Sequence, residues 1–121
     1  MNNTIIKKVI KVVKNNCDME ERWKYHLYPM SKYAMLLADK YKADKEVVIL
    51  ASWLHDITRT KGGVENHHIT GAKEAEKILK REGYARDKID HIKSCIYSHR
   101  GSIKIKRKTI EAEIVANADA L

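Results

Sequence analysis

His55 and Asp56 stand side by side in the stretch WLHDITRT, directly after a run of apolar residues. Burying an ionised carboxylate costs several kcal/mol unless a partner compensates its charge. Further imidazole and carboxylate groups stand at intervals along the chain: His26, His67, His68, His99 and Asp119. Nitrogen and oxygen donors of this kind suit divalent first-row metals. A bound cation would therefore make several inward-facing members of this set tolerable together.

Each of these residues has a plainer interpretation when it is taken alone. A single histidine on an apolar face is more often a hydrogen-bonded core residue than a metal ligand, and Asp119 could be a solvated helix residue. His91 stands among charged neighbours and is expected at the surface. Of His67 and His68, one is expected to be a spectator. The order of these residues along the chain, together with the His55–Asp56 doublet, is what favours a metal site over separate structural roles.

The first two expected helices bring one candidate into position. Apolar residues recur at helical spacing from Ile5 to Val13 and predict the first helix. The second is expected from about Tyr25 to Tyr41. Pro29 lacks an N–H and is best tolerated in a first turn, which places His26 at the very start of this helix.

The middle helices are expected to bring two more candidate positions. Asp44 is the expected N-cap of a third helix, which carries the His-Asp doublet near its end. A loop with adjacent glycines follows. The fourth helix is expected to start at His67 or His68 and to stop at Gly83, a suitable C′ residue.

The last part of the chain completes an all-α prediction. His99 continues the apolar face of a fifth helix, which Gly101 should end. Residues 102–108 are a basic connector, with weak alternation that favours a short extended piece. Thr109 can cap a last helix that carries Asp119. We therefore expect a single compact bundle of about six helices, forming one domain over residues 1–121.

The composition limits the classes of protein to consider. The chain has 121 residues, of which 44% are hydrophobic and 33% are charged. Its apolar runs are short, so we expect no membrane span. The two cysteines, Cys17 and Cys95, are far apart, as in reduced cytoplasmic proteins. The net charge of +8 favours anionic partners, either a small phosphate ester or nucleic acid.

The ordered pattern of His, His-Asp and Asp on successive helices resembles the HD-domain superfamily of metal-dependent phosphohydrolases. The resemblance covers about residues 22 to 121. The matching segments are YHLYPMSKYAMLLADKY with His26, ILASWLHDITRT with the doublet, HHITGAKEAEKIL, IKSCIYSHR with His99 and EAEIVANADAL with Asp119. Family members usually continue with further helix after the last Asp, whereas this chain stops two residues later. It is therefore expected to be either a minimal domain or a shortened sequence.

The resemblance implies roles for individual residues. One divalent metal would be held by His26, His55, Asp56 and Asp119. Asp56 would bridge to a second ion, held by His67 and His99. His67 is preferred to His68 because it stands four residues before Gly71, the family spacing. Arg59 matches a basic position that faces substrate phosphate, with Lys61 and Arg100 as weaker candidates. The resemblance leaves the metal open among iron, manganese, zinc, cobalt, nickel and magnesium.

The resulting hypothesis is an enzyme that uses metal-activated water to cleave a nucleotide or a related phosphate ester or anhydride. A metal ion can lower the pKa of bound water from 15.7 to roughly 7. One alternative is a non-catalytic HD-like module that binds a metal or a nucleotide. The other is a basic RNA-binding helical module. It is disfavoured because the sequence suggests no exposed aromatic residues interleaved with the basic ones.

Overall fold

The computed structural model describes residues 1–17, 20–57, 67–99 and 106–120, apart from the side chains of Arg22 and His67. The elements in chain order are α1 (Asn3–Asn16), α2 (Glu20–Arg22), the π-helical turn η1 (Trp23–Leu27), α3 (Tyr28–Lys40), α4 (Lys45–Leu54), α5 (His67–Arg81), α6 (Arg86–Tyr97) and α7 (Ile110–Asp119). Six of the described helices have ten residues or more. The predicted all-α fold is confirmed. None of the described helices is both long and apolar enough to cross a bilayer.

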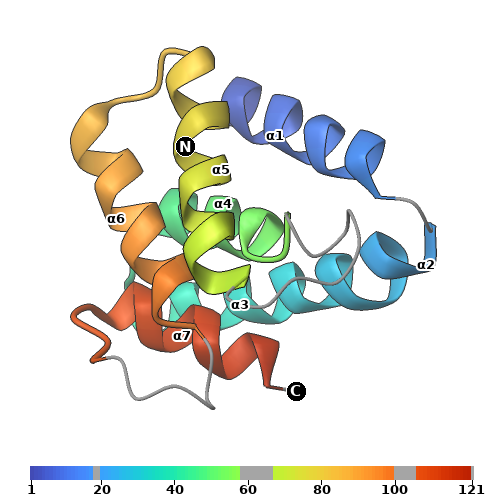
Figure 1. Cartoon of the computed structure of the whole chain (residues 1–121). Coiled ribbons are helices and arrows are strands. Elements are labelled where there is room, and N and C mark those ends of the chain that lie inside the picture. The colour runs from blue at the N-terminus through green and yellow to red at the C-terminus, as the bar shows by residue number, and fades with distance from the viewer. Residues whose placement is uncertain (18–19, 58–66, 100–105, 121) are drawn as a thin grey trace.

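Helix α4 is the central helix of the bundle. From Val47 to Leu54 every residue is buried except the half-buried Ile49. The helix contacts α1, α3, α6 and α7, and Figure 1 shows it enclosed by its neighbours. A helix that is apolar on all sides belongs in the interior. Consequently the turn that follows α4, which carries His55 and Asp56, also lies inside the bundle.

Three of the helix boundaries predicted from local signals, at Asp44, Thr109 and Gly83, are confirmed. The Asp44 carboxylate accepts the Val47 N–H at 3.2 Å, and the Thr109 hydroxyl accepts the Ala112 N–H at 3.2 Å. Both side chains therefore act as N-caps. Gly83 follows α5 with φ of +72°, a conformation that glycine adopts without steric cost.

The second predicted helix starts earlier than predicted. The chain is already helical from Glu20, and α2, η1 and α3 follow one another without a break. Pro29 has no N–H to donate, and in a regular α-helix its ring would clash with the carbonyl of Tyr25. The wider π-helical turn relieves that conflict. His26 therefore lies within a π turn and not at the start of a helix.

The prediction that His99 continues a helical face is wrong, because α6 ends at Tyr97. The Ser98 hydroxyl donates to the Ser94 carbonyl at 2.8 Å, and Arg107 Nε donates to the Ser98 carbonyl at 2.9 Å. Arg107 thus occupies a carbonyl that a continuing helix would use. His99 is nevertheless buried, two residues beyond the helix. Gly101 and most of the expected extended piece lie outside the described residues, and residues 106–108 form no strand.

Candidate metal centre

His55 lies fully buried just after α4, and both of its ring nitrogens have partners. Nδ1 donates its proton to the Ser52 carbonyl at 2.7 Å. Nε2 faces two carboxylates, at 3.3 Å from Asp56 Oδ2 and 3.1 Å from Asp119 Oδ1. A carbonyl bond at one ring nitrogen fixes the orientation and tautomer of metal-binding histidines. Here it directs Nε2 toward the carboxylates.

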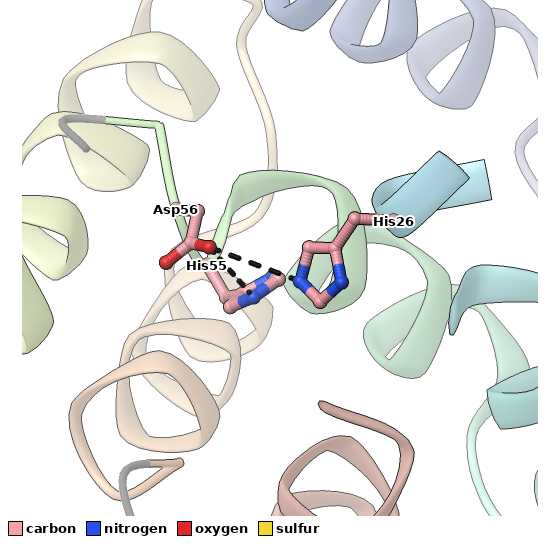
Figure 2. Close-up of side chains that lie close together, drawn as sticks. All are labelled: His26, His55 and Asp56. Atoms are coloured by element: carbon pink, nitrogen blue, oxygen red, sulfur yellow. Dashed lines mark ion pairs between the residues drawn. The ribbon is translucent and has the colours of Figure 1, made fainter. Parts of the chain in front are cut away.

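His26 approaches the same carboxylates from a different element. Figure 2 shows the rings of His26 and His55 both joined by dashed lines to the Asp56 carboxylate. Nε2 of His26 lies 3.2 Å from Asp119 Oδ1 and 3.9 Å from Asp56 Oδ2. The His26 side chain is 43% exposed, whereas that of Asp56 is 8% exposed. His26 therefore stands at the open side of the group.

His99 joins from the segment after α6, and Asp119 is the last residue of α7. Nδ1 of His99 donates to the Ile96 carbonyl, and Nε2 lies 4.0 Å from Asp119 Oδ2. The His55 and His99 rings meet edge to face with centroids 4.9 Å apart. We refer to the resulting group as the His/Asp cluster: His26, His55, Asp56, His99 and Asp119.

The charges in the His/Asp cluster depend on one another. Burial opposes protonation of His55, but the hydrogen bonds and charges of Asp119 and Asp56 outweigh it and raise its pKa to about 10. Burial also raises the pKa of a carboxyl group, yet the neighbouring imidazoles hold the pKa values of Asp56 and Asp119 well below their ordinary range. Burial and the nearby His55 charge lower the pKa of His99 to about 4. In the metal-free state, a proton on His55 therefore balances part of the carboxylate charge.

The donor set of the cluster fits a divalent cation. Its ligand atoms form two trios that share His55: His26, His55 and Asp56, and His55, His99 and Asp119. Within each trio these atoms lie within 4.8 Å of one another. Neutral imidazoles add no charge, so the two carboxylates contribute two negative charges, which one divalent ion neutralises. The residue types are those that bind first-row metals.

The structure describes fewer of the residues that were assigned to the second ion and to phosphate. His67 begins α5, but its side chain is outside the description, as are Arg59, Lys61 and Arg100. His68 is buried, with its ring centroid 5.4 Å from that of Tyr97. The preference for His67 over His68 therefore stays a prediction.

Two residues that orient the cluster escaped the sequence analysis. Ser52 and Ile96 each offer a backbone carbonyl to the histidine three residues later, His55 or His99. The common spacing is a signal that sequence could have provided. The spacing can be interpreted only once the structure shows that both segments follow the end of a helix and make the same hydrogen bond.

Comparison with known proteins identifies the family of this chain. The family model of the HD domain matches residues 23–121. The chain belongs to the HD-domain family. The resemblance on which the sequence analysis relied is thus confirmed, and η1, α3, α4, α5, α6 and α7 all lie within this HD domain, whereas α1 precedes it.

The fold of this HD protein is also found in a solved structure. It is similar to the crystal structure of a predicted HD superfamily hydrolase from an uncultured Thermotogales bacterium, with a TM-score of 0.80 and 23% identity. That comparison covers 94% of this chain and 66% of the other. A curated relative, the tRNA (cytidine(56)-2'-O)-methyltransferase of Picrophilus torridus, is 33% identical over 110 residues, which cover 79% of this chain and 30% of that protein. The HD protein thus spans less than two thirds of the length of either.

Proposed function

We propose that this HD protein is a metal-dependent phosphohydrolase that cleaves a nucleotide or a related phosphate ester or anhydride. The observation that carries the proposal is the common orientation of His55 and His99. Each donates its Nδ1 proton to a backbone carbonyl and turns Nε2 toward Asp119. Imidazole nitrogens held in this way beside ionised carboxylates form a ready cation site. The HD-domain family and the likeness to a predicted hydrolase support phosphoryl chemistry.

His26, His55, Asp56 and Asp119 would hold the first cation, and the residues of the cluster have different roles. A divalent cation supplies Lewis acidity, which lowers the pKa of water and stabilises charge on phosphoryl oxygens. His55 and His99 form the buried, fixed side of the site, because their side chains are 0% and 1% exposed. Asp56 has a lowered pKa, so it remains ionised and can accept a hydrogen bond from the attacking water. His26 and Asp119 are more exposed, so they form the open side of the site, from which a substrate can approach.

Arg59 and a second ion complete the proposal. Arg59 stands three residues after Asp56 in the sequence, and we assign it to the substrate phosphate because a guanidinium matches phosphate oxygens with a rigid fork of donors. A second ion would use His67 in addition to Asp56 and His99. The HD protein would then be of the two-metal type.

Nucleic-acid binding is the second candidate function. The observation that favours it is the 33% identity with a protein that is named for a modification of tRNA. The net charge of +8 suits a polyanion. A third role, a module that binds metal or nucleotide without turnover, is less favoured because such a module has no need for this complete set of donors.

The test begins with protein purified without chelator. Elemental analysis gives the metal and its stoichiometry, and a panel of phosphate monoesters, diesters and nucleoside triphosphates gives the bond that is cut. Turnover that disappears with chelator and returns with a single metal supports the proposal. Full turnover in chelator, or metal bound without turnover of any member of the panel, contradicts it. Metal analysis of His67→Ala and His68→Ala then decides which neighbour binds the second ion.

A further inference from the structure

Three exposed tyrosines lie on η1 and α3, and two of them, Tyr25 and Tyr33, line a pocket together with His26 of the His/Asp cluster. Tyr25 is 70% exposed, Tyr28 is 47% exposed and Tyr33 is 39% exposed. The expectation that aromatic residues are absent from the basic surface is therefore wrong for this segment. Helix turns bring residues that are distant in sequence to one side of the rod. Tyr25 and Tyr33 border Ala118 of α7, whereas Tyr28 lines a separate groove with Lys32 and Trp53. The three exposed rings therefore span the solvent side of one continuous helical segment.

Two lysines accompany these rings. Lys24 Nζ lies 5.7 Å from the centre of the Tyr25 ring, and Lys32 Nζ lies 4.9 Å from that of Tyr28. Among the residues that the structure describes, neither lysine forms an ion pair with a carboxylate. Their charges therefore remain available to an anionic partner. We call this surface the Lys–Tyr face: Lys24, Tyr25, Tyr28, Lys32 and Tyr33.

A small pocket connects the Lys–Tyr face with the His/Asp cluster. Its volume is about 180 Å³, and its lining consists of Tyr25, His26, Pro29, Met30, Tyr33 and Ala118. His26 belongs to the cluster, and Ala118 directly precedes Asp119. Helices α3 and α7 contact each other along this side of the molecule (Figure 1). A planar ring placed between the two tyrosines would thus lie next to the proposed catalytic residues.

We infer that the Lys–Tyr face binds a single-stranded nucleic acid, with one base in the pocket beside His26 and an adjoining phosphate toward the His/Asp cluster. Aromatic side chains that stack on bases, together with a positive surface that follows the backbone, are the features by which proteins bind single strands. A duplex keeps its bases stacked inside and cannot use the tyrosines in this way. The inference rests on the proposed function for the fate of the phosphate. The binding itself requires no metal.

The experiment measures fluorescence anisotropy of labelled oligoadenylate, as RNA and as DNA, with the full chain in EDTA. Binding of either strand that is tighter than binding of the matching duplex supports the inference. The double variant Tyr25→Ala/Tyr33→Ala should bind about 5-fold to 150-fold more weakly for each base that loses its stacking partner. The matched control is Tyr41→Ala, since Tyr41 is also exposed, at 54%, and Lys40 lies over its ring. This control should bind within about twofold of the unchanged protein.

The salt dependence tests the lysines separately. Lys24→Gln/Lys32→Gln should flatten the slope of log K against log salt by about 0.7 for each phosphate contact that is lost. Equal affinity for adenosine monophosphate and the oligonucleotide, or an equal loss in Tyr41→Ala, would overturn the inference. A metal-loaded assay on bis(p-nitrophenyl) phosphate keeps the two proposals apart. Hydrolysis without strand binding overturns only the inference that the Lys–Tyr face binds a single strand. Strand binding without hydrolysis overturns only the proposal of phosphohydrolase activity.

Discussion

Two of the polar clusters between the described helices of this HD protein balance their charges differently. In the first, which we call the Glu/Lys cluster, Lys88 is a fixed partner of Asp44 and Glu46, and Glu111 is joined to them through the Asp44 N–H. Lys88 Nζ lies 3.3 Å from Asp44 Oδ2 and 3.5 Å from Glu46 Oε2. The Tyr84 hydroxyl donates to Glu46 Oε1 at 2.5 Å, and Glu111 Oε2 accepts the Asp44 N–H at 2.8 Å.

The His/Asp cluster uses titratable partners in place of a lysine. The described ion-pair partners of Asp56 and Asp119 are the imidazoles of His26, His55 and His99. A lysine has no lone pair to offer while it is charged, whereas an imidazole that loses its proton becomes a metal ligand. The difference teaches that the first cluster joins helices, while the second can exchange a proton for a metal ion.

Replacing Asp56 should produce the largest effect. Asp56→Ala removes a carboxylate from the cation site, so metal content and phosphohydrolase activity should both fall to background. Elemental analysis and turnover measure the two losses. The matched control is Glu46→Ala in the Glu/Lys cluster, which should keep its metal even if it melts at a lower temperature. The contrast between the clusters breaks down if Asp56→Ala keeps full metal content, or if Glu46→Ala loses it.

Arg59 extends the comparison between the two clusters, because it is a permanently charged side chain that we assign to the substrate phosphate and not to a carboxylate of the chain. Arg59→Ala should leave metal content unchanged and lower kcat/KM by about 10- to 150-fold, the usual value of a hydrogen bond to a charged group. Arg59→Lys should recover only part of the loss, since the charge remains and the fork of donors does not. Arg81→Ala, at the exposed end of α5, is the control and should have no effect. Unchanged kinetics in Arg59→Ala would transfer the role to Lys61, Arg100 or the metal.

Metal removal should lower the stability of the folded state. At a free metal concentration of 100 times Kd, binding contributes about 2.7 kcal/mol, and chelation should lower Tm by roughly 10 °C. Asp119→Asn should lack this chelator-dependent shift, whereas Glu46→Gln should retain it. Thermal melts with and without metal make the comparison. A shift of equal size in Asp119→Asn would show that the metal binds elsewhere.

Tyr84→Phe tests the Glu/Lys cluster alone. The change leaves the half-buried Glu46 carboxylate without its hydroxyl donor, which should cost about 1.5 kcal/mol in the free energy of unfolding. Urea denaturation measures the loss, and metal content should not change. Tyr41→Phe, at an exposed ring, should cost nothing measurable. Full stability in Tyr84→Phe would mean that this bond does not help to join the helices.

The smallest expected effect is the pH dependence of the Glu/Lys cluster. Burial acts to raise the pKa of Glu46, but Tyr84 and Lys88 together hold it below its ordinary value of 4.5. The unfolded chain therefore binds this proton at higher pH than the folded one, so the stabilisation is present above pH 4.5 and is lost as the pH falls below it. The pKa of Lys88 is raised, although burial opposes this, so its contribution disappears only as the pH rises above 10.5. Glu46→Gln should reduce the acid-side loss by less than about 1 kcal/mol, read from unfolding curves at several pH values.

Local sequence signals predicted much of the fold. The caps Asp44 and Thr109 and the stop at Gly83 each depend on a backbone group at most four residues away, so the spacing alone reveals them. Longer-range effects account for the errors. His91 was expected at the surface, yet its Nε2 lies 3.1 Å from Thr109 Oγ1 and 3.3 Å from Glu111 Oε1, because the start of α7 packs over α6. The end of α6 likewise depends on Arg107, nine residues after Ser98.

The sequence by itself determined the residue types of the His/Asp cluster, their order along the chain and the helices that carry them. Helical periodicity and the types of donor atoms are local properties, so both can be read from the amino-acid sequence. Only the tertiary structure decided that Nε2 of His26, His55 and His99 would meet the Asp119 carboxylate, and that Tyr25 and Tyr33 would border a pocket beside it. The physical reason is that side-chain directions follow from how α3, α4, α6 and α7 pack, together with the π turn that precedes Pro29 and the two hydrogen bonds to carbonyls that fix the rings. Those contacts join residues that lie up to 93 positions apart, and no local pattern specifies them.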